Sequence, residues 1–211
     1  MDPSRIEIVL HGTDLPVIDE KRPREGIVFY GGHHPLRGKG LHAVFQAMAT
    51  LKTRLGSKAP RLKVHGYFSA EDLAAVKELA AQFGLQNDIA WFMQIPMAEA
   101  FRLYQSSLLC VLPFMGSSAG LAAATAAAAG LPVIATRNAG IPEHIGEDGI
   151  WIDNDDPEQL VEQIEKLLGS DELRRDLSNR LRKRAEECLS WDVVADKTLA
   201  VYERALHRKR N

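Results

Sequence analysis

The chain has 211 residues, of which 26% are charged and 45% hydrophobic, with a formal net charge of −2, and this suits a globular domain with a core of ordinary size. The charge balance lacks the basic excess of nucleic-acid binders, so we expect no nucleic-acid partner. The sequence has no run close to the ~20 apolar residues of a membrane helix and begins without the apolar core of a signal peptide, so a cytoplasmic location is expected.

Residues up to about 25 indicate a linker, because only a weak alternation at 6–10 precedes Pro16, Pro23 and several charges. Apolar strand-like runs then alternate with helical spacings. Strands are expected at 27–30, 62–65, 89–92, 108–112, 132–135 and 149–152, and helices at 41–55, 70–83, 97–104 and over the alanine-rich stretch between the fourth and fifth strands.

This alternation predicts an α/β fold, a Rossmann-like parallel sheet with helices on both faces, because helical connections of this length imply right-handed crossovers. Ligands of such sheets bind beyond the carboxyl ends of the strands. The segments expected at that rim are 31–39, the loop at Gly66, 93–95, 116–120 and 138–143.

The chain after residue 152 is expected to be entirely helical. Helices are predicted at 157–168, 172–188 and 191 to about 206. Their caps would be Asp155 or Asp156, then Ser170 or Asp171, then Ser190. The basic end at 204–210 suits a solvated tail and could also touch an anionic membrane.

Neither the cysteines nor the histidines predict a metal site. Cys110 and Cys188 lie far apart in the sequence, which favours free thiols over a disulfide framework. The adjacent His33 and His34 lack a third ligand at a suitable spacing. The acidic segment 153–155 precedes a helix that it can cap, which explains its carboxylates without a metal.

Two loops could bind an anion. The glycine-rich loop 31–40 lets the backbone approach a ligand, and Lys39 offers a point charge to a diphosphate, although a plain surface turn would explain the loop equally well. Ser117 and Ser118 stand before the alanine-rich helix, where N–H groups and the helix dipole favour a phosphate. The alanine run alone would indicate only tight packing of a helix on a sheet.

The segments Ala129–Ile134 and Ala139–Glu143 follow this helix, with the sequences AGLPVI and AGIPE. Their order and spacing resemble the donor-binding signature of the glycosyl transferases group 1 family, retaining enzymes of the GT-B fold. In that family two glutamates stand where this chain has Ser117 and Thr125, so both carboxylates are missing.

The resemblance implies a site for a nucleotide diphosphate sugar. Backbone amides of Gly120 and Leu121 would meet the diphosphate together with Lys39. The position of a family arginine falls on His34, or on Gly32 or His33 if the loop differs by one residue, and Arg37 could replace it. The predicted substrate-binding set is His34, Arg37, Lys39, Gly116, Ser117, Ser118, Gly120, Leu121, Thr125 and Glu143, with no catalytic residue and no metal ligand. The segment 93–95 would face the nucleotide base.

The resemblance runs from about Arg5 to Leu206 and implies one half of a GT-B fold. Residues 1–25 would form a linker or remnant strand, 26–189 the nucleotide-sugar-binding domain, and 190–211 a crossover helix with a basic tail. The implied function is sugar transfer with retention and without a metal or other cofactor. It would require a GT-B N-terminal domain in cis or in trans, and the chain alone would be inactive.

Because both family glutamates are replaced, a second reading stays open. The chain could be a non-catalytic module that keeps the scaffold and supports a partner transferase. A sugar-nucleotide epimerase of the same fold is a third reading, which the transferase-like glycine pattern disfavours. Neither the nucleotide base, the sugar nor the acceptor follows from the sequence.

Overall fold

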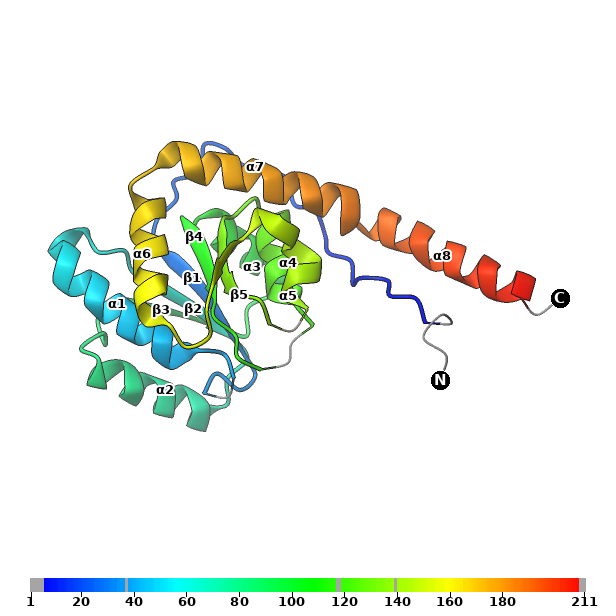
Figure 1. Ribbon diagram of the computed structural model, residues 1–211. Helices are drawn as coiled ribbons and strands as arrows, with labels where there is room; N and C mark the ends of the chain where they lie inside the picture. The colour runs from blue at the N-terminus through cyan, green and yellow to red at the C-terminus, as the bar shows by residue number, and fades with distance from the viewer. Residues whose placement is uncertain (1–5, 37, 117–118, 139, 209–211) are drawn as a thin grey trace.

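A computed structural model describes residues 6–36, 38–116, 119–138 and 140–208. Its centre is a parallel sheet with the strand order β3-β2-β1-β4-β5-β6 (Figure 1). The strands are β1 (Ile27–Gly32), β2 (Leu62–Gly66), β3 (Ile89–Met93), β4 (Leu109–Leu112), β5 (Val133–Thr136) and β6 (Ile150–Ile152). The helices are α1 (Leu41–Leu55), α2 (Ala70–Gln82), α3 (Met97–Gln105), α4 (Leu121–Ala128), α5 (Ile141–Ile145), α6 (Pro157–Leu168), α7 (Asp171–Cys188) and α8 (Trp191–Arg208), with two 3₁₀ turns, η2 (Gly56–Lys58) and η3 (Gly146–Asp148).

The predicted fold class is confirmed: a Rossmann-like sheet is followed by C-terminal helices. Figure 1 shows α1 and α6 on one side of the sheet and α3, α4 and α5 on the other. All residues of β4 and β5 are buried, as expected for central strands covered on both faces. Predicted strand and helix bounds differ from the observed ones by two residues at most.

The alanine-rich helix α4 lies between the sheet and α7. Its residues Ala122–Ala128, including Thr125, are all buried. It packs on α5 and α7 as well as on the strands. Small side chains let these neighbours approach the helix backbone closely, which explains why a helix buried on every side consists of alanine.

Local capping fixes where three of the helices begin. The side chains of Ser69, Asp156 and Ser170 accept hydrogen bonds from backbone N–H groups three residues on, at 3.0, 2.9 and 3.1 Å. Of the alternatives predicted, the N-caps are therefore Asp156 and not Asp155, and Ser170 and not Asp171. Ser190 also accepts a bond, from the Val193 N–H at 3.4 Å, so this predicted cap is confirmed.

The N-terminal segment runs beside the start of α8, which projects away from the sheet (Figure 1). The Thr13 N–H donates to the Leu189 carbonyl at 2.8 Å, and Trp191 Nε1 donates to Asp14 Oδ1 at 3.0 Å. Residues 6–12 form no strand and Thr13 makes only an isolated bridge to Ser190, while the assignment of residues 1–25 to a linker or remnant strand stays a prediction. A strand needs a paired neighbour along its length, and none of the described segments supplies one there.

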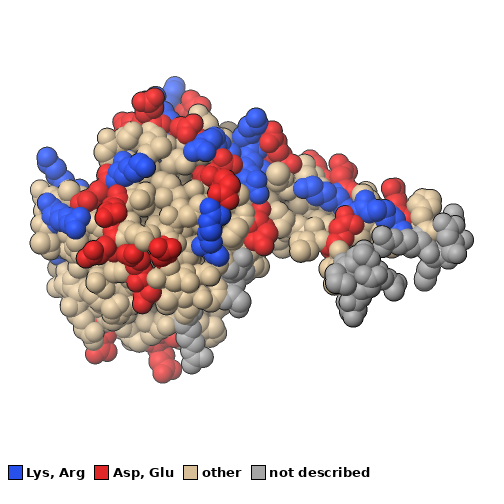
Figure 2. Space-filling view, in the orientation of Figure 1, with Lys and Arg blue, Asp and Glu red and all other residues tan. Residues whose placement is uncertain are grey.

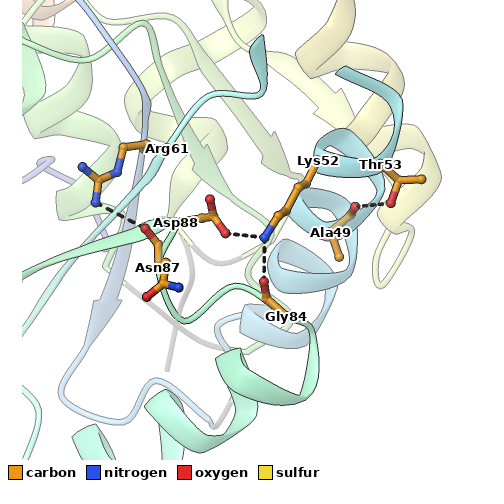
Figure 3. A network of polar contacts seen from close by, with 7 residues as sticks. All are labelled: Ala49, Lys52, Thr53, Arg61, Gly84, Asn87 and Asp88. Atoms are coloured by element: carbon orange, nitrogen blue, oxygen red, sulfur yellow. Dashed lines mark hydrogen bonds and ion pairs between the residues drawn. The ribbon is translucent and has the colours of Figure 1, made fainter. Parts of the chain in front are cut away.

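A polar network ties the end of α1 to the turn before β3 (Figure 3). Lys52 Nζ donates to the Gly84 carbonyl at 2.8 Å and to Asp88 Oδ2 at 2.7 Å. Both side chains of this ion pair are partly exposed, so it positions the turn more than it stabilises the fold.

The surface carries both signs of charge. Figure 2 shows Lys and Arg side chains interspersed with Asp and Glu over the body and along α8, without a large field of one sign on this face. Among the described residues, no helix combines the length and the apolar character that crossing a membrane would require.

Candidate functional site

The topological switch point of the sheet lies between the neighbouring strands β1 and β4. The chain moves outward from β1 to β2 and β3 on one side and from β4 to β5 and β6 on the other. In open parallel sheets this point leaves a crevice at the carboxyl ends of the strands, where ligands bind. The loops that border it here are 33–40 after β1 and 113–120 after β4.

These two loops are joined through their backbones. The Gly38 carbonyl accepts hydrogen bonds from Met115 N–H at 2.9 Å and from Gly116 N–H at 3.1 Å. Gly40 has φ +69°, and a Cβ there would lie 2.0 Å from the Pro113 carbonyl oxygen. Only glycine fits this position, so the close contact of the two loops is built into the sequence.

Lys39 lies in this contact. Its Nζ stands 4.1 Å from the centre of the Phe114 ring, a cation–π distance, and a Cβ built on Gly32 would lie 4.0 Å from the same Nζ. Burial lowers the pKa of the Lys39 ammonium. Within the described part of the chain, Lys39 has no ion-pair partner.

A partly buried cation without a counter-ion is unfavourable, and a bound anion would relieve that cost. The crevice therefore has the electrostatics of an anion site. Its positive charge comes from a side chain held in place by an aromatic ring rather than by a carboxylate.

The post-β4 loop is also fixed from β5. The Phe114 carbonyl accepts hydrogen bonds from Thr136 Oγ1 at 2.5 Å and from Asn138 Nδ2 at 2.7 Å. Thr136 is fully buried, so its hydroxyl has no water to bond instead. These two side chains position the residue whose ring holds Lys39.

The start of α4 faces the start of α5. Gly120 is the N-cap of α4 with φ +77°, and a Cβ there would lie 2.4 Å from the Gly140 carbonyl oxygen and 2.5 Å from His144 Nδ1. Leu121, by contrast, is 42% exposed at the rim. The first N–H groups of any α-helix lack partners within the helix, which makes this end a suitable place for a phosphate.

His144 is a buried histidine that the sequence reasoning missed. Its Nδ1 lies 2.6 Å from the Gly140 carbonyl, and its buried Nε2 has no hydrogen-bond partner among the described residues. Burial lowers its pKa against the opposing effect of the Gly140 bond. The ring is therefore neutral at neutral pH, with Nδ1–H as the donor and an acceptor lone pair on Nε2.

The predicted site residues differ in what the structure gives them to do. Thr125 is buried and its hydroxyl donates to the Leu121 carbonyl at 2.9 Å, a bond within its own helix. Gly116 uses its N–H in the bond to Gly38. His34 is exposed on the loop after β1, and Glu143 is exposed in the first turn of α5. Arg37, Ser117 and Ser118 lie outside the described residues.

The segment predicted to face a nucleotide base lies at the end of β3. Gln94 has φ +54°, a left-handed conformation that is uncommon for a residue other than glycine. Its N–H donates to the Gly66 carbonyl at 2.8 Å, which fixes the turn after β3 to the end of β2. Sequence reasoning missed Phe114, Thr136 and His144 as residues of the rim, whereas Asn138 lies in the segment 138–143 that was expected there.

Comparison with known proteins shows which family this chain belongs to. The sequence profile of the family described as glycosyl transferases group 1 matches residues 16–184. The chain is 30% identical over 171 residues to a D-inositol 3-phosphate glycosyltransferase of Corynebacterium urealyticum, covering 79% of this chain and 40% of that protein. It is 28% identical to an MMP alpha-(1->4)-mannosyltransferase of Mycolicibacterium hassiacum, covering 99% of this chain and 50% of that one.

Solved structures share the fold. The C-terminal domain of a glycosyl transferase group 1 family protein from Francisella tularensis superposes with a TM-score of 0.68 at 22% identity, covering 82% of this chain and 90% of that domain. A sucrose-phosphate synthase from Thermosynechococcus elongatus gives a TM-score of 0.80 at 24% identity, covering 94% of this chain and 52% of that one. The chain thus spans about half the length of the curated relatives it matches.

Proposed function

The chain belongs to the glycosyl transferases group 1 family, and from this premise we propose that it is the nucleotide-sugar-binding domain of a glycosyltransferase. The observation that carries the proposal is the position of Lys39. Its ammonium is partly buried and lies at the topological switch point of the sheet, beside the loop that leads into α4. The diphosphate of a nucleotide sugar would supply the negative charge that Lys39 lacks.

The proposed chemistry is stabilisation of a leaving group. When the bond between the sugar and the diphosphate breaks, negative charge grows on the diphosphate oxygens. Lys39 and the amide end of α4 are fixed before the reaction and therefore stabilise that charge without reorganising. Charge stabilisation of this kind needs no metal ion, and retention of the anomeric configuration is what the family membership favours.

Titration calorimetry with uridine, guanosine and adenosine diphosphate sugars tests donor binding. We expect heat with at least one of them, and a loss of about tenfold to a hundredfold in affinity for Lys39→Gln, because a hydrogen bond to a charged group contributes about 1.5–3 kcal/mol. Lys58→Gln is the matched control, since Lys58 is exposed on η2 before the amino end of β2. Folded protein without heat for any nucleotide sugar, or equal losses in the two variants, would contradict the proposal.

A second candidate is a non-catalytic module that supports a partner transferase. It is favoured by the bond of Thr125 to its own helix and by the neutral residues at 117 and 125. The double variant Ser117→Glu with Thr125→Glu separates the two candidates, with its stability checked by urea unfolding. Higher nucleotide-sugar affinity would indicate a decayed site, whereas lower affinity in a folded variant would indicate a site adapted to its present residues.

We also propose that the acceptor and the rest of the active site come from a second Rossmann-like half, in the same chain or in a partner. On α8 the exposed side chains of Leu199, Tyr202 and Leu206 recur at intervals of three and four residues and so share one helix face. An exposed apolar stripe of this kind suits docking against another domain. Leu199→Asp should weaken assembly with such a half in size-exclusion chromatography, while Lys197→Asp, at an exposed polar position of the same helix, should not.

A further inference from the structure

A cavity of about 680 Å³ lies at the edge of the sheet opposite to the donor crevice. Leu108 and Gly130, which line it, come just before β4 and β5, so the cavity opens at the amino ends of these strands. Its other walls are the connector at 18–24 and the first turns of α7, the helix that crosses the top of the molecule in Figure 1. A ligand here would not compete with one in the donor crevice.

The lining is rich in arginine. Four guanidinium groups face two carboxylates: Arg24, Arg174, Arg175 and Arg182 against Glu20 and Asp171. Two of the four have internal partners, because Arg174 pairs with Asp171 and Arg182 Nε lies 2.6 Å from Glu186 Oε1.

The other two arginines are not neutralised. Arg24 donates from Nη1 to the Gly130 carbonyl at 3.0 Å, and that carbonyl bears no charge. Across the described ranges, neither Arg24 nor Arg175 is within ion-pair distance of a carboxylate. The cavity thus holds two guanidinium groups without an ion-pair partner among the described residues, and Glu20, the other carboxylate of its wall, is not within ion-pair distance of either.

Like charges also meet inside it. Burial first, and then the positive charge of Arg174, lower the pKa of the Arg24 guanidinium. The Arg174 side chain is only 17% exposed, so water screens this repulsion poorly. Two neighbouring guanidinium groups in a partly buried cavity are stabilised when an anion lies between them.

We propose that this cavity binds a small metabolite that carries a phosphate monoester. A dianion balances the two unpaired guanidinium groups, and the planar fork of arginine fits phosphate oxygens in pairs. The volume is within the range of small-molecule sites and exceeds what a bare phosphate would fill. Ser178 and Asn179 offer hydroxyl and amide groups to a hydroxyl-bearing remainder, which favours a sugar or polyol phosphate.

Calorimetry with glucose 6-phosphate, inorganic phosphate and glucose tests this site on the whole 211-residue chain. We expect glucose 6-phosphate to bind more tightly than inorganic phosphate, and glucose not to bind. Arg24→Gln and Arg175→Gln should each weaken glucose 6-phosphate about tenfold or more. Arg175 is exposed and makes no internal ion pair, so its variant should fold even if Arg24→Gln does not.

Two controls fix the location. Lys183→Gln removes one positive charge from the same helix at a side chain that is 74% exposed and does not line the cavity, and its affinity should be unchanged. Lys39→Gln should also leave glucose 6-phosphate binding intact, and hydrogen exchange should slow at 18–24 and at the start of α7. The proposal fails if no phosphate ester binds at millimolar concentration, if Arg175→Gln matches Lys183→Gln, or if Lys39→Gln abolishes binding.

Discussion

The buried histidine of β2 gives a pH dependence of stability that can be calculated. His65 is 5% exposed, and neither of its ring nitrogens has a hydrogen-bond partner among the described residues. Its ring is surrounded by those of Tyr30, Tyr67 and Tyr104, with centroid distances of 5.2, 6.2 and 6.2 Å. Burial lowers its pKa to about 4.

The sign of the effect follows from the two pKa values. In the unfolded chain the imidazole takes up a proton near its ordinary pKa of about 6.5, whereas in the folded protein it resists protonation until about pH 4. Between these values the unfolded state binds more protons, so the free energy of unfolding falls as the pH falls. The loss from His65 alone is about 2 kcal/mol between about pH 7 and pH 5, and nearly complete, at about 3 kcal/mol, by pH 4.

Urea unfolding of the wild type and of His65→Leu over this pH range measures that loss. The leucine has no titrating group, so the variant does not lose this stability. The free energy of unfolding of the variant minus that of the wild type should therefore rise by about 2 kcal/mol as the pH falls from 7 to 5. His144, whose pKa is also lowered by burial, contributes equally to both proteins and cancels in the difference. Parallel stability curves for the two proteins would refute the reasoning, because His65 would then titrate alike in the folded and unfolded states.

The loop contact at the candidate site leads to two further expectations, both measurable by urea unfolding. Gly40→Ala should lower the free energy of unfolding by more than about 2 kcal/mol, because the new Cβ would clash with the Pro113 carbonyl. Gly84→Ala is the control, with the same φ of +69° and nothing within 4 Å, and should lower it by only about 1 kcal/mol. Equal losses in the two variants would exclude the clash as the cause. Thr136→Val should lower the free energy of unfolding by about 1–2 kcal/mol, because the Phe114 carbonyl loses the hydroxyl that donates to it. If that carbonyl positions the ring that contacts Lys39, the variant should also lower the affinity for nucleotide sugars. Thr136→Ser, which keeps the hydroxyl, should retain both the stability and the affinity. Unchanged affinity in a folded valine variant would separate this hydrogen bond from the site.

Helices were predictable from the sequence because their signals are local. The bounds of α1 and α6 match the predicted 41–55 and 157–168, since the apolar spacing lies within the segments themselves and Asp156 caps α6 from the preceding position. No bounds were predicted for the short helix α5. Five residues contain too few turns for a periodic pattern, so the start of this helix is set by what packs on it.

The candidate site was predictable only in part, because its geometry depends on contacts between distant segments. The charge of Lys39 could be read directly, but its place over the Phe114 ring joins residues that are far apart in sequence and adjacent only because β1 and β4 are neighbours. The same holds for His144 against Gly120, and for the four arginines that converge from the connector and α7. The sequence shows which side chains are charged, but it does not show which of them lie near an opposite charge. The sites described above are defined by charged side chains that lack an ion-pair partner among the described residues.

The absence of the two family glutamates therefore bears less on the fold than on affinity. The rim is shaped by backbone contacts: Gly38 bonds to the loop after β4, and Gly120 packs on Gly140, where a side chain would clash. Neither contact involves the side chain at 125, whose hydroxyl bonds to its own helix. A crevice built in this way keeps its shape when carboxylates around it are lost. The affinity of Lys39→Gln for nucleotide sugars is therefore the measurement that decides between a donor site and a supporting module.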